Sequence, residues 1–279
     1  MRDGLRIAVL GAGYVGSAFA RAAVSSNPRH AVWAVRRTVS PSAEGGVTWL
    51  SGDIARGVVA ELPQRLDVVV LTVAPSRGVD TYERTYLPAA TAAVNLVTAT
   101  GAQKLLYTSS TGVYGGRNGD WVTEQSPRLG AGAANAALCG TEDVILGAEG
   151  VTPTVLRVAG IYGPGRDPRA RMTASVQLPQ RGEYWVNVAH RDDIVSAMLH
   201  VMLLPKAASV LNVSDGAPCT AAHLARWLAT ARGESAESLV FGNGEQQSRN
   251  DQRVSNATLL ATGWSPRFAT FMDGLTHGM

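Results

Sequence analysis

The sequence has few cysteines and no long uninterrupted apolar run. Its two cysteines, Cys139 and Cys219, lie far apart and have neither the spacing of a disulfide framework nor that of a zinc site. No stretch approaches the roughly 20 consecutive apolar residues that a membrane helix needs. A strand-like segment begins almost at the first residue, so no signal peptide is expected. These absences predict a cytoplasmic protein with reduced cysteines and no membrane partner.

Charge is also sparse. Only 17% of the 279 residues are charged, the net charge is +3, and the basic residues are scattered without a run or a basic stripe. Nucleic acid is therefore not an expected partner. Lys104 and Lys206 are the only lysines, so a mechanism that requires a lysine must use one of these two. The length and the 46% hydrophobic content allow one large α/β domain, with or without a small appendage.

Short β-branched runs alternate with alanine-rich amphipathic segments through the first two thirds of the chain. Strands are predicted at 7–10, 31–35, 47–53, 67–73, 104–110, 152–158 and 209–214. Helices are predicted at 15–26, 83–100, 140–150 and 192–203. Continuous apolar strands separated by helices indicate an α/β fold, a Rossmann-type doubly wound parallel sheet of about seven strands.

A glycine-rich turn follows the first predicted strand. Gly11, Gly13 and Gly16 form GAGYVG directly before a helix, which is the context of the dinucleotide-binding fingerprint. In that fingerprint the first glycine permits the tight turn, the second lets the backbone approach the pyrophosphate, and the third lets helix and strand pack closely. A glycine-rich turn without a ligand is the alternative interpretation. The flanking strand and helix favour a bound dinucleotide.

The end of the second strand discriminates between the two nicotinamide cofactors, because a carboxylate there binds the ribose 2′-hydroxyl whereas arginine accommodates a 2′-phosphate. Here Arg36 and Arg37 occupy that place, and no acid follows until Glu44. The sequence therefore predicts NADP(H), with a solvated surface turn as the alternative. Asp53, after the next strand, is a candidate for the adenine edge or for a helix N-cap.

Six segments, in order along the chain, resemble the extended short-chain dehydrogenase/reductase superfamily, which includes nucleotide-sugar epimerases and dehydratases. They are GAGYVG, YTSSTGVYG, VLRVAGIYGPGR, NVAHRDDIVSAM, LNVSDGAP and GWSPRF. The resemblance implies an NADP(H)-binding domain at 1–162, completed by 184–215, and a small substrate-binding subdomain at 163–183 and 216–279. Together with the glycine turn it implies these cofactor-binding residues: Gly11, Gly13, Tyr14, Val15, Gly16, Arg36, Arg37, Asp53, Val73, Ala74, Ser109, Ala159 and Ile161.

The family's catalytic residues are a Ser or Thr at the end of the fifth strand and a Tyr-x-x-x-Lys pair on the next helix. Ser110 matches the serine, and Thr111 is adjacent. The pair has no match, because its two positions fall at Asn135 and Cys139 or, one residue earlier, at Ala134 and Leu138; the helix reads GAGAANAALCG. The chain thus resembles the atypical extended members that lack this pair.

Two tyrosines are candidates to replace the pair as proton donors. Tyr114 and Tyr162 match family positions that border the substrate pocket, although packing or substrate contact is the alternative for both. His190 suits general acid work by its near-neutral titration, but it resembles a structural histidine, followed by Asp192 and Asp193 at a helix start. Cys139 as a nucleophile is disfavoured against a small buried residue.

Two further groups of residues are candidates to line the substrate pocket. Tyr82, Glu83 and Tyr86 follow the fourth strand, at the edge where this architecture binds ligands. An arginine-rich loop carries candidates for an anionic substrate, or for a solvated loop: Arg166, Arg169 and Arg171.

The sequence therefore predicts NADPH-dependent reduction of a small or medium organic substrate. Ser110 and Thr111 would bind the acceptor, and an imine or a conjugated enone suits the missing pair better than a simple ketone. An epimerase or dehydratase that recycles its nicotinamide and a non-catalytic NADP(H)-binding regulator are the alternatives. Because relatives often dimerise through helices of the sheet domain, a homodimer is one candidate assembly.

Overall fold

The computed structural model describes residues 4–39, 45–59, 61–75, 80–115, 117–129, 132–168, 177–178, 182–242 and 251–279. The chain divides into two compact units. Unit 1 consists of Met1–Ser110, Gly130–Arg157 and Val195–Leu211, and unit 2 of Thr111–Leu129, Val158–Ile194 and Asn212–Met279. This division differs from the boundaries expected from the sequence, because it assigns to unit 2 several segments expected in the cofactor domain: 111–129, 158–162, 184–194 and 212–215.

The central sheet has the strand order β13-β8-β6-β5-β1-β2-β3-β4. The strands are β1 (Arg6–Leu10), β2 (Ala31–Arg36), β3 (Val47–Asp53), β4 (Val58–Val59), β5 (Val68–Leu71), β6 (Lys104–Ser110), β8 (Thr152–Val158) and β13 (Val210–Val213). Seven strands form the parallel sheet of a Rossmann-like fold, and β4 runs antiparallel to β3 at the edge. Because β1 pairs with both β2 and β5, the winding direction reverses at β1, where such sheets bind ligands.

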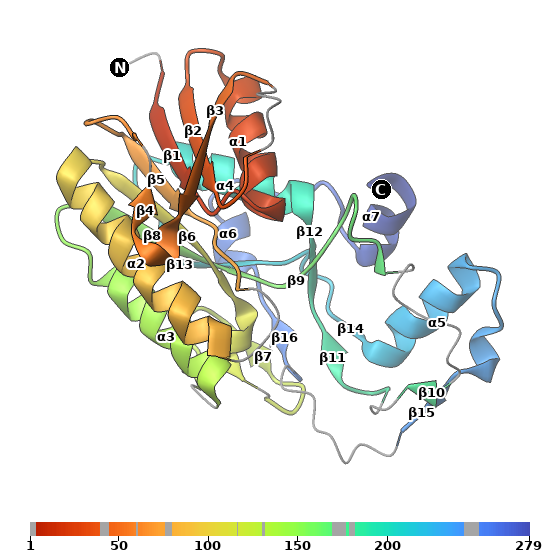
Figure 1. Ribbon diagram of the computed structural model, residues 1–279. Coiled ribbons are helices and arrows are strands. Elements are labelled where there is room, and N and C mark those ends of the chain that lie inside the picture. Colours follow the sequence, from red (N-terminus) through yellow and green to blue (C-terminus); the bar gives the residue numbers. More distant parts are fainter. Residues whose placement is uncertain are drawn as a thin grey trace. The chain divides into compact units, whose positions relative to one another are not determined.

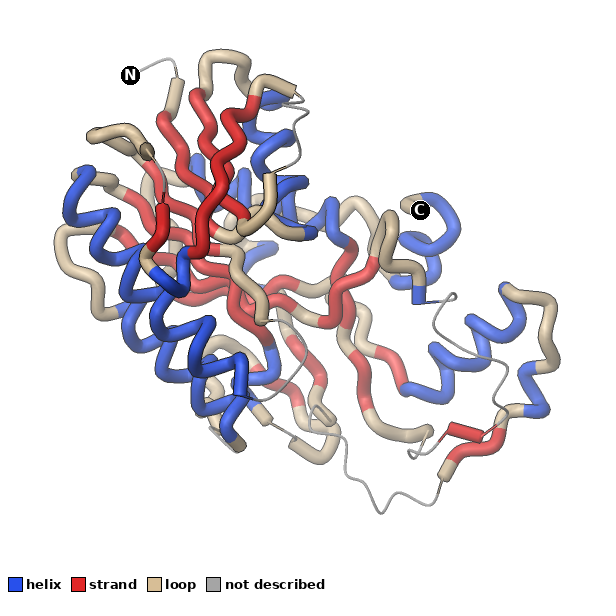
Figure 2. Tube along the Cα trace, viewed as in Figure 1, coloured by secondary structure: helices blue, strands red, loops and turns tan. Residues whose placement is uncertain are grey.

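Helices cover both faces of this sheet. Alternate residues of β1 point to opposite faces: Ala8 and Leu10 belong to a core cluster with buried alanines of α2 (Asp80–Thr100), whereas Val9 lies against Gly16 of α1 (Tyr14–Ser26). In Figures 1 and 2, α2 lies beside α3 (Ala133–Leu146) on the face opposite α1. Burial on both faces explains the unbroken apolar runs of β1 and β5.

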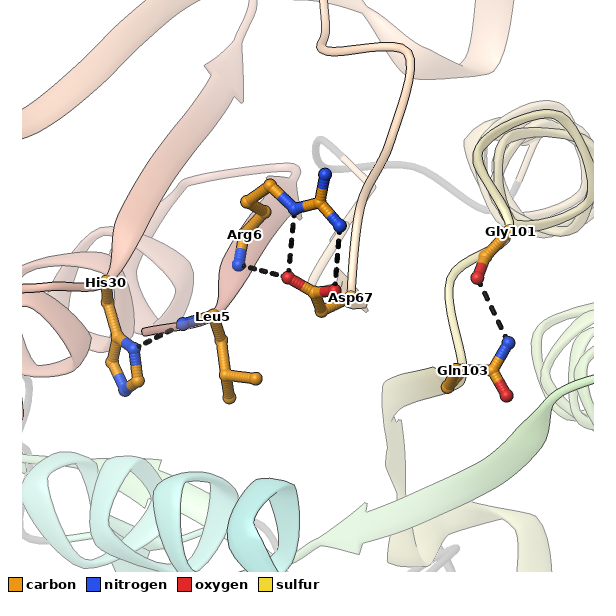
Figure 3. Close-up of polar contacts among 6 residues, drawn as sticks. All are labelled: Leu5, Arg6, His30, Asp67, Gly101 and Gln103. Atoms are coloured by element: carbon orange, nitrogen blue, oxygen red, sulfur yellow. Dashed lines mark hydrogen bonds and ion pairs between the residues drawn. The ribbon is translucent and has the colours of Figure 1, made fainter. Parts of the chain in front are cut away.

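Polar contacts tie together the starts of β1 and β5, away from the ligand-binding edge (Figure 3). The backbone N–H and Nε of Arg6 donate to Oδ2 of Asp67 at 2.8 and 3.0 Å, and a terminal nitrogen donates to Oδ1 at 3.0 Å. Nδ1 of His30 accepts from the backbone N–H of Leu5 at 2.9 Å. These contacts fix the register of the strands at their amino ends. The carboxyl ends of the strands are at the opposite side of the sheet and can form a site.

Unit 2 is built from short strands and helices. β9 (Gly160–Tyr162) runs parallel to β12 (Val188–His190). The other two-stranded pairs are β7 (Trp121–Val122) with β16 (Arg253–Val254), β11 (Trp185–Val186) with β14 (Cys219–Thr220), and β10 (Gln177–Leu178) with β15 (Val240–Phe241). The helices are α5 (Ala221–Ala231), α6 (Ala257–Leu260) and α7 (Phe271–His277), and α4 (Arg191–Leu203) begins in unit 2 and continues in unit 1.

Most predicted elements are confirmed, and three strands, 47–53, 104–110 and 152–158, have the predicted bounds. The helix predicted at 140–150 begins earlier, at Ala133, and therefore includes the positions expected for the missing pair; its alanine-rich first turns are themselves strong helix formers. None of the helices in the described ranges has the length and apolar composition required to cross a bilayer.

One of the two lysines has a structural role. Nζ of Lys104, at the start of β6, donates to the carbonyl oxygen of Met202 at 2.6 Å and also to that of Leu204. A cation at these carbonyls compensates the negative end of the α4 dipole. Lys206 is exposed in the following loop. Neither lysine therefore lies on α3.

Candidate functional site

The glycine turn after β1 has the geometry that the fingerprint requires. Gly11 adopts a left-handed conformation with φ +81°, and its backbone N–H donates to the carbonyl oxygen of Val35 at 3.0 Å. A Cβ at Gly11 would lie 2.6 Å from Cγ1 of Val73, and one at Gly16 would lie 2.3 Å from Oγ1 of Thr72. Both positions therefore exclude a side chain, because the residues that follow β5 already fill that space.

Gly13 differs from the other two glycines because the space beside it is open. A Cβ built there would have Gly11 O, at 3.8 Å, as its nearest neighbour among the described residues. Gly13 is also the N-cap of α1, where no side chain of the described residues caps the helix and the first turn carries no acid. An open cradle at a positive helix end fits the pyrophosphate of a dinucleotide, with Tyr14, Val15 and Gly16 supplying the first helical N–H groups.

The arginines at the end of β2 have different environments. Arg36 is half-buried and its guanidinium carbon lies 4.7 Å from the ring centroid of Trp49 on β3, whereas Arg37 is exposed. Nε of Arg36 is buried and has no hydrogen-bond partner among the described residues. A guanidinium that is held in place, and that has no carboxylate partner in the described part of the chain, is suited to an anionic ligand.

The other predicted cofactor-binding residues at the carboxyl ends of these strands make few side-chain contacts in the described structure. Asp53 ends β3 and precedes a short 3-10 helix, Ile54–Arg56, but its side chain makes no capping hydrogen bond in the described structure. Its carboxylate lies 3.8 Å from Nε of Arg56, and this ion pair is largely exposed. Val73 packs on Gly11, and Ala74 is exposed. The contact of Val73 with Gly11 is consistent with the edge at which a dinucleotide binds.

Ser109, expected to bind the cofactor, instead belongs to a buried polar network. Its hydroxyl donates to Oε1 of Glu142 at 2.7 Å. Arg157 on β8 donates to the same carboxylate, from Nε at 3.1 Å and from a terminal nitrogen at 2.7 Å. The side chains of Arg157 and Glu142 are 4% and 0% exposed. The network joins β6, α3 and β8. The Ser109 hydroxyl therefore points into the protein interior, where Glu142 accepts its hydrogen bond.

Ser110 and Thr111 stand at the carboxyl end of β6. Ser110 is the last residue of the strand and is half-buried. Thr111 begins a 3-10 turn, Thr111–Tyr114, and its carbonyl oxygen accepts from Nε2 of Gln252 at 3.2 Å. The predicted positions of the missing pair lie on α3, as expected. The whole helix contains neither tyrosine nor lysine.

The structure disfavours Tyr114 as a proton donor. Its side chain has 0% exposure, and its hydroxyl donates to Oδ1 of Asn212 at 2.7 Å within unit 2. Nδ2 of Asn212 donates in turn to the carbonyl oxygen of Ser255 at 3.0 Å. Tyr114 therefore acts as a polar anchor in the core of unit 2, and this role satisfies its hydroxyl without a substrate.

Tyr162 is buried in the small core of unit 2, with Leu228, Phe271 and Leu275. Its hydroxyl has no hydrogen-bond partner among the described residues, and it lies so close to Gly274 that a Cβ there would be 2.0 Å from the oxygen. Burial raises the pKa of Tyr162, and the carboxylates of Asp215, Asp193 and Asp273 act in the same direction. Such a phenol is a weak acid, which disfavours proton donation at neutral pH.

His190 is confirmed as a residue with structural contacts. Its Nε2 is 2.9 Å from the carbonyl oxygen of Gly278, and its Nδ1 accepts from the backbone N–H of Asp192 at 3.2 Å, so the proton is assigned to Nε2. Asp193 accepts from the backbone N–H groups of Arg267 and Phe268 at 2.7 and 3.2 Å. The segment containing His190 therefore holds the C-terminal residues of the chain.

The remaining candidates lie on several different elements. Ala159 and Ile161 belong to unit 2, where the backbone N–H of Ala159 donates to the carbonyl oxygen of Val213 at 3.0 Å. Tyr82 and Tyr86 pair on α2 with ring centroids 5.5 Å apart, and Glu83 is exposed beside them. Cys139 is half-buried. Arg166 lies in a turn after β9, and Arg169 and Arg171 lie outside the described residues.

Comparison with known proteins identifies the family. The model of the NAD dependent epimerase/dehydratase family matches residues 7–214, which is most of the chain. This chain belongs to the NAD-dependent epimerase/dehydratase family. An NAD(P) cofactor is typical of the family, and the cradle at Gly13 fits such a cofactor.

Relatives of known sequence and structure agree with this assignment. Protein YeeZ of Escherichia coli (strain K12) is 33% identical over 160 residues, which span 57% of this chain and 55% of that protein. An NAD-dependent epimerase/dehydratase structure from Methylobacillus flagellatus has a TM-score of 0.79 and 25% identity, with 98% of this chain and 96% of that chain covered. The dTDP-glucose 4,6-dehydratase of Bacillus anthracis, in complex with NAD, has a TM-score of 0.80 and 19% identity, with 98% and 95% covered. The last similarity concerns the fold alone.

Sequence reasoning did not find the Glu142–Arg157 pair or the contact between Trp49 and Arg36. The available signal for the first was an arginine inside the apolar segment TPTVLRV and two acidic residues inside TEDVIL. Such residues require a buried partner of opposite charge. For the contact between Trp49 and Arg36, the signal was a tryptophan on β3, the strand that follows the arginine-bearing strand β2. The sequence did not indicate the register in which these two strands pair.

Asp215 gives unit 2 of this family member a predicted pH dependence. Burial raises the pKa of its carboxyl to about 7, although the backbone N–H of Ala217 donates to Oδ1 at 3.0 Å. The folded chain then retains a proton that the unfolded chain releases above roughly pH 4, so stability falls as the pH rises to about 7 and this contribution is constant above it. The loss is at most about 1.4 kcal/mol per pH unit.

The variant Asp215→Asn isolates this effect, because an amide keeps the acceptor for Ala217 and does not ionise. We expect it to be more stable than the natural chain at about pH 8 and to show a smaller fall in stability between about pH 5 and 7. Urea unfolding across this range measures the difference. Equal pH slopes for the two proteins would show that Asp215 ionises in the fold at its ordinary pKa.

Proposed function

We propose that this chain is an NADPH-dependent reductase that acts on a small or medium organic substrate by hydride transfer without the Tyr-x-x-x-Lys pair. The observation that carries the proposal is the combination of an open dinucleotide cradle at Gly13 with Arg36 at the end of β2 and no tyrosine or lysine on α3. Family membership supports a nicotinamide cofactor. The arginines support the 2′-phosphorylated form.

The residues of the chain would bind, orient and shield the reactants. The backbone at Gly13 and the start of α1 would hold the pyrophosphate, and Arg36 with Arg37 would hold the 2′-phosphate. Bound NADPH supplies the hydride. Ser110 and Thr111 would hydrogen-bond the acceptor atom at the end of β6, and solvent would supply the proton that accompanies reduction.

An imine or a conjugated enone is the acceptor class that we propose. A simple ketone requires a strong proton donor at its oxygen, and the buried positions of Tyr114 and Tyr162 make both of them poor donors. An iminium carbon is already activated before hydride arrives, and an enone distributes the developing charge. Such acceptors therefore place smaller demands on an acid from the protein.

The cofactor assignment is tested by calorimetric titration with NADPH and NADH. Replacing both arginines (Arg36→Ala/Arg37→Ala) is expected to weaken NADPH binding by about 10- to 30-fold and to leave NADH binding within about twofold, because only NADPH carries the 2′-phosphate. Equal affinity of the natural chain for the two cofactors would contradict the assignment.

The reaction class is tested by following NADPH absorbance with a panel of cyclic imines, enones, ketones and aldehydes, and with secondary alcohols and NADP⁺ in the reverse direction. We expect stoichiometric NADPH oxidation with an imine or an enone. Efficient oxidation of simple secondary alcohols would contradict the proposal.

The activities named for two similar structures favour a second candidate function. One of these structures is a dTDP-glucose 4,6-dehydratase with NAD, and another is a UDP-glucose 4-epimerase with UDP-glucose. An epimerase or dehydratase of this kind returns its nicotinamide to the starting state in each turnover. Conversion of a nucleotide sugar without net NADPH consumption would therefore identify this alternative.

A further inference from the structure

An aromatic ring on β3 contacts two arginines from different elements of unit 1. The guanidinium carbon of Arg36 lies 4.7 Å from the centroid of the Trp49 ring, and that of Arg21, on α1, lies 5.3 Å from it. Both distances are within the range of a cation–π interaction. The two arginines and Trp49 form a cluster, here called the Trp49 cluster, beside the end of β2.

The sheet register explains how the sequence builds this cluster. Trp49 pairs with Ala34 on β2, and Arg36 pairs with Ser51, so Trp49 and Arg36 are diagonal neighbours on one face of adjacent strands. Arg21 reaches the ring from the helix that follows the glycine turn. One end of the cluster therefore belongs to the same helix whose first turn forms the dinucleotide cradle.

The cluster carries positive charge that the described residues do not neutralise. Nε of Arg36 is buried without a hydrogen-bond partner, and neither Arg36 nor Arg21 has an ion pair with a carboxylate of the described part of the chain. Two guanidinium groups held near one ring raise the local positive potential. A dianionic phosphate is the ligand that such a potential favours most.

We propose that Trp49 is a positioning residue that determines cofactor specificity: its ring holds the Arg36 guanidinium in place for the 2′-phosphate of NADP(H), and Arg21 adds to the positive potential there. This inference rests on the proposed NADP(H) function. A free arginine side chain loses about 2 kcal/mol of rotamer entropy when a ligand fixes it. Stacking on Trp49 fixes Arg36 before the ligand arrives, so less entropy is lost on binding.

The effect is specific to one phosphate group. NAD(H) has a hydroxyl where NADP(H) has the 2′-phosphate, so the orientation of Arg36 contributes little to its binding. Removal of the Trp49 ring should therefore change the ratio of the two affinities. A structural defect would weaken both ligands together.

The test uses calorimetric titration with 2′,5′-ADP and with 5′-AMP, two fragments that differ only in the 2′-phosphate. Trp49→Leu is expected to weaken 2′,5′-ADP binding by about 5- to 20-fold and to leave 5′-AMP binding within about twofold. Trp49→Phe keeps a ring face and should stay within about threefold for both ligands. Trp49→Met is the second variant without a ring, in case leucine at this position prevents folding.

Arg36→Gln separates the failure of this inference from the failure of the proposed function. We expect it to weaken 2′,5′-ADP at least as strongly as Trp49→Leu does, and the double variant Trp49→Leu/Arg36→Gln to lose little more than Arg36→Gln alone, because the two residues act as a unit. Arg21→Gln should cause a smaller loss that decreases at high salt.

Each contrary result has a distinct meaning. A loss for Arg36→Gln without a loss for Trp49→Leu and Trp49→Met would overturn the positioning role and leave the NADP(H) assignment in place. No loss for Arg36→Gln would overturn the role of Arg36 and with it this inference, whereas equal affinity of the natural chain for 2′,5′-ADP and 5′-AMP would overturn the NADP(H) assignment itself. Equal weakening of both fragments by the ringless variants would show that Trp49 supports the fold or the adenosine, and would also overturn the inference.

Discussion

Replacing Arg157 by methionine is expected to lower the free energy of unfolding by about 3–5 kcal/mol, one of the largest effects that a single substitution in this chain should have. The Glu142 carboxylate has 0% exposure and lies 2.7 Å from a terminal nitrogen of Arg157. Without the guanidinium, the carboxylate keeps its hydrogen bond from the Ser109 hydroxyl but loses the cation that compensates its charge. It must then remain ionised without a cation or take up a proton, and either change destabilises the fold.

Urea unfolding of three variants measures this prediction. The double variant Glu142→Leu/Arg157→Met should recover most of the lost stability, because removing both charges also removes the cost of burying them. Arg232→Met breaks a more exposed pair with Glu234 and should cost less than about 1 kcal/mol. If Arg157→Met costs no more than Arg232→Met, the Glu142 carboxylate is hydrated and the buried pair does not stabilise unit 1.

The elements that were predictable from the sequence are those whose pattern is local. A parallel strand buried on both faces is a continuous apolar run, so the bounds of β6 and β8 follow directly from the residues. The glycine turn was predictable for a related reason. The left-handed conformation of Gly11 and the close packing at Gly11 and Gly16 depend on neighbours that every strand–turn–helix unit of this kind brings together.

The contacts that were not predictable join residues far apart in the chain. Tyr114 was expected at a substrate pocket, but its hydroxyl reaches Asn212, 98 residues away. Ser109 was expected to face the cofactor. Because side chains alternate along a strand, its hydroxyl and that of Ser110 point to opposite faces of β6, and only the partner Glu142 shows which face is interior. Sequence position therefore located these residues at the correct strand end without giving their orientation.

Gly13→Ala is expected to weaken NADPH and NADH binding by about 100-fold or more and to leave the melting temperature almost unchanged. Gly13 has a negative φ of −83°, and a Cβ at this position would enter open space, with no described atom nearer than 3.8 Å. That space is where the pyrophosphate would approach the start of α1. A methyl group there would displace the phosphates from the backbone N–H groups, and two lost hydrogen bonds to a charged group account for this magnitude.

Gly16→Ala is the matched control, because it adds the same methyl group three residues later with the opposite expected result. Its Cβ would lie 2.3 Å from Oγ1 of Thr72 and 3.1 Å from the carbonyl oxygen of Gly11, so α1 must shift away from the sheet. We expect a loss of about 1–3 kcal/mol in the free energy of unfolding. Calorimetric titration and thermal unfolding of both variants separate ligand contact from packing. If Gly13→Ala binds both cofactors as the natural chain does, the open space beside Gly13 is not a phosphate site, and the turn has only the packing role that Gly11 and Gly16 show.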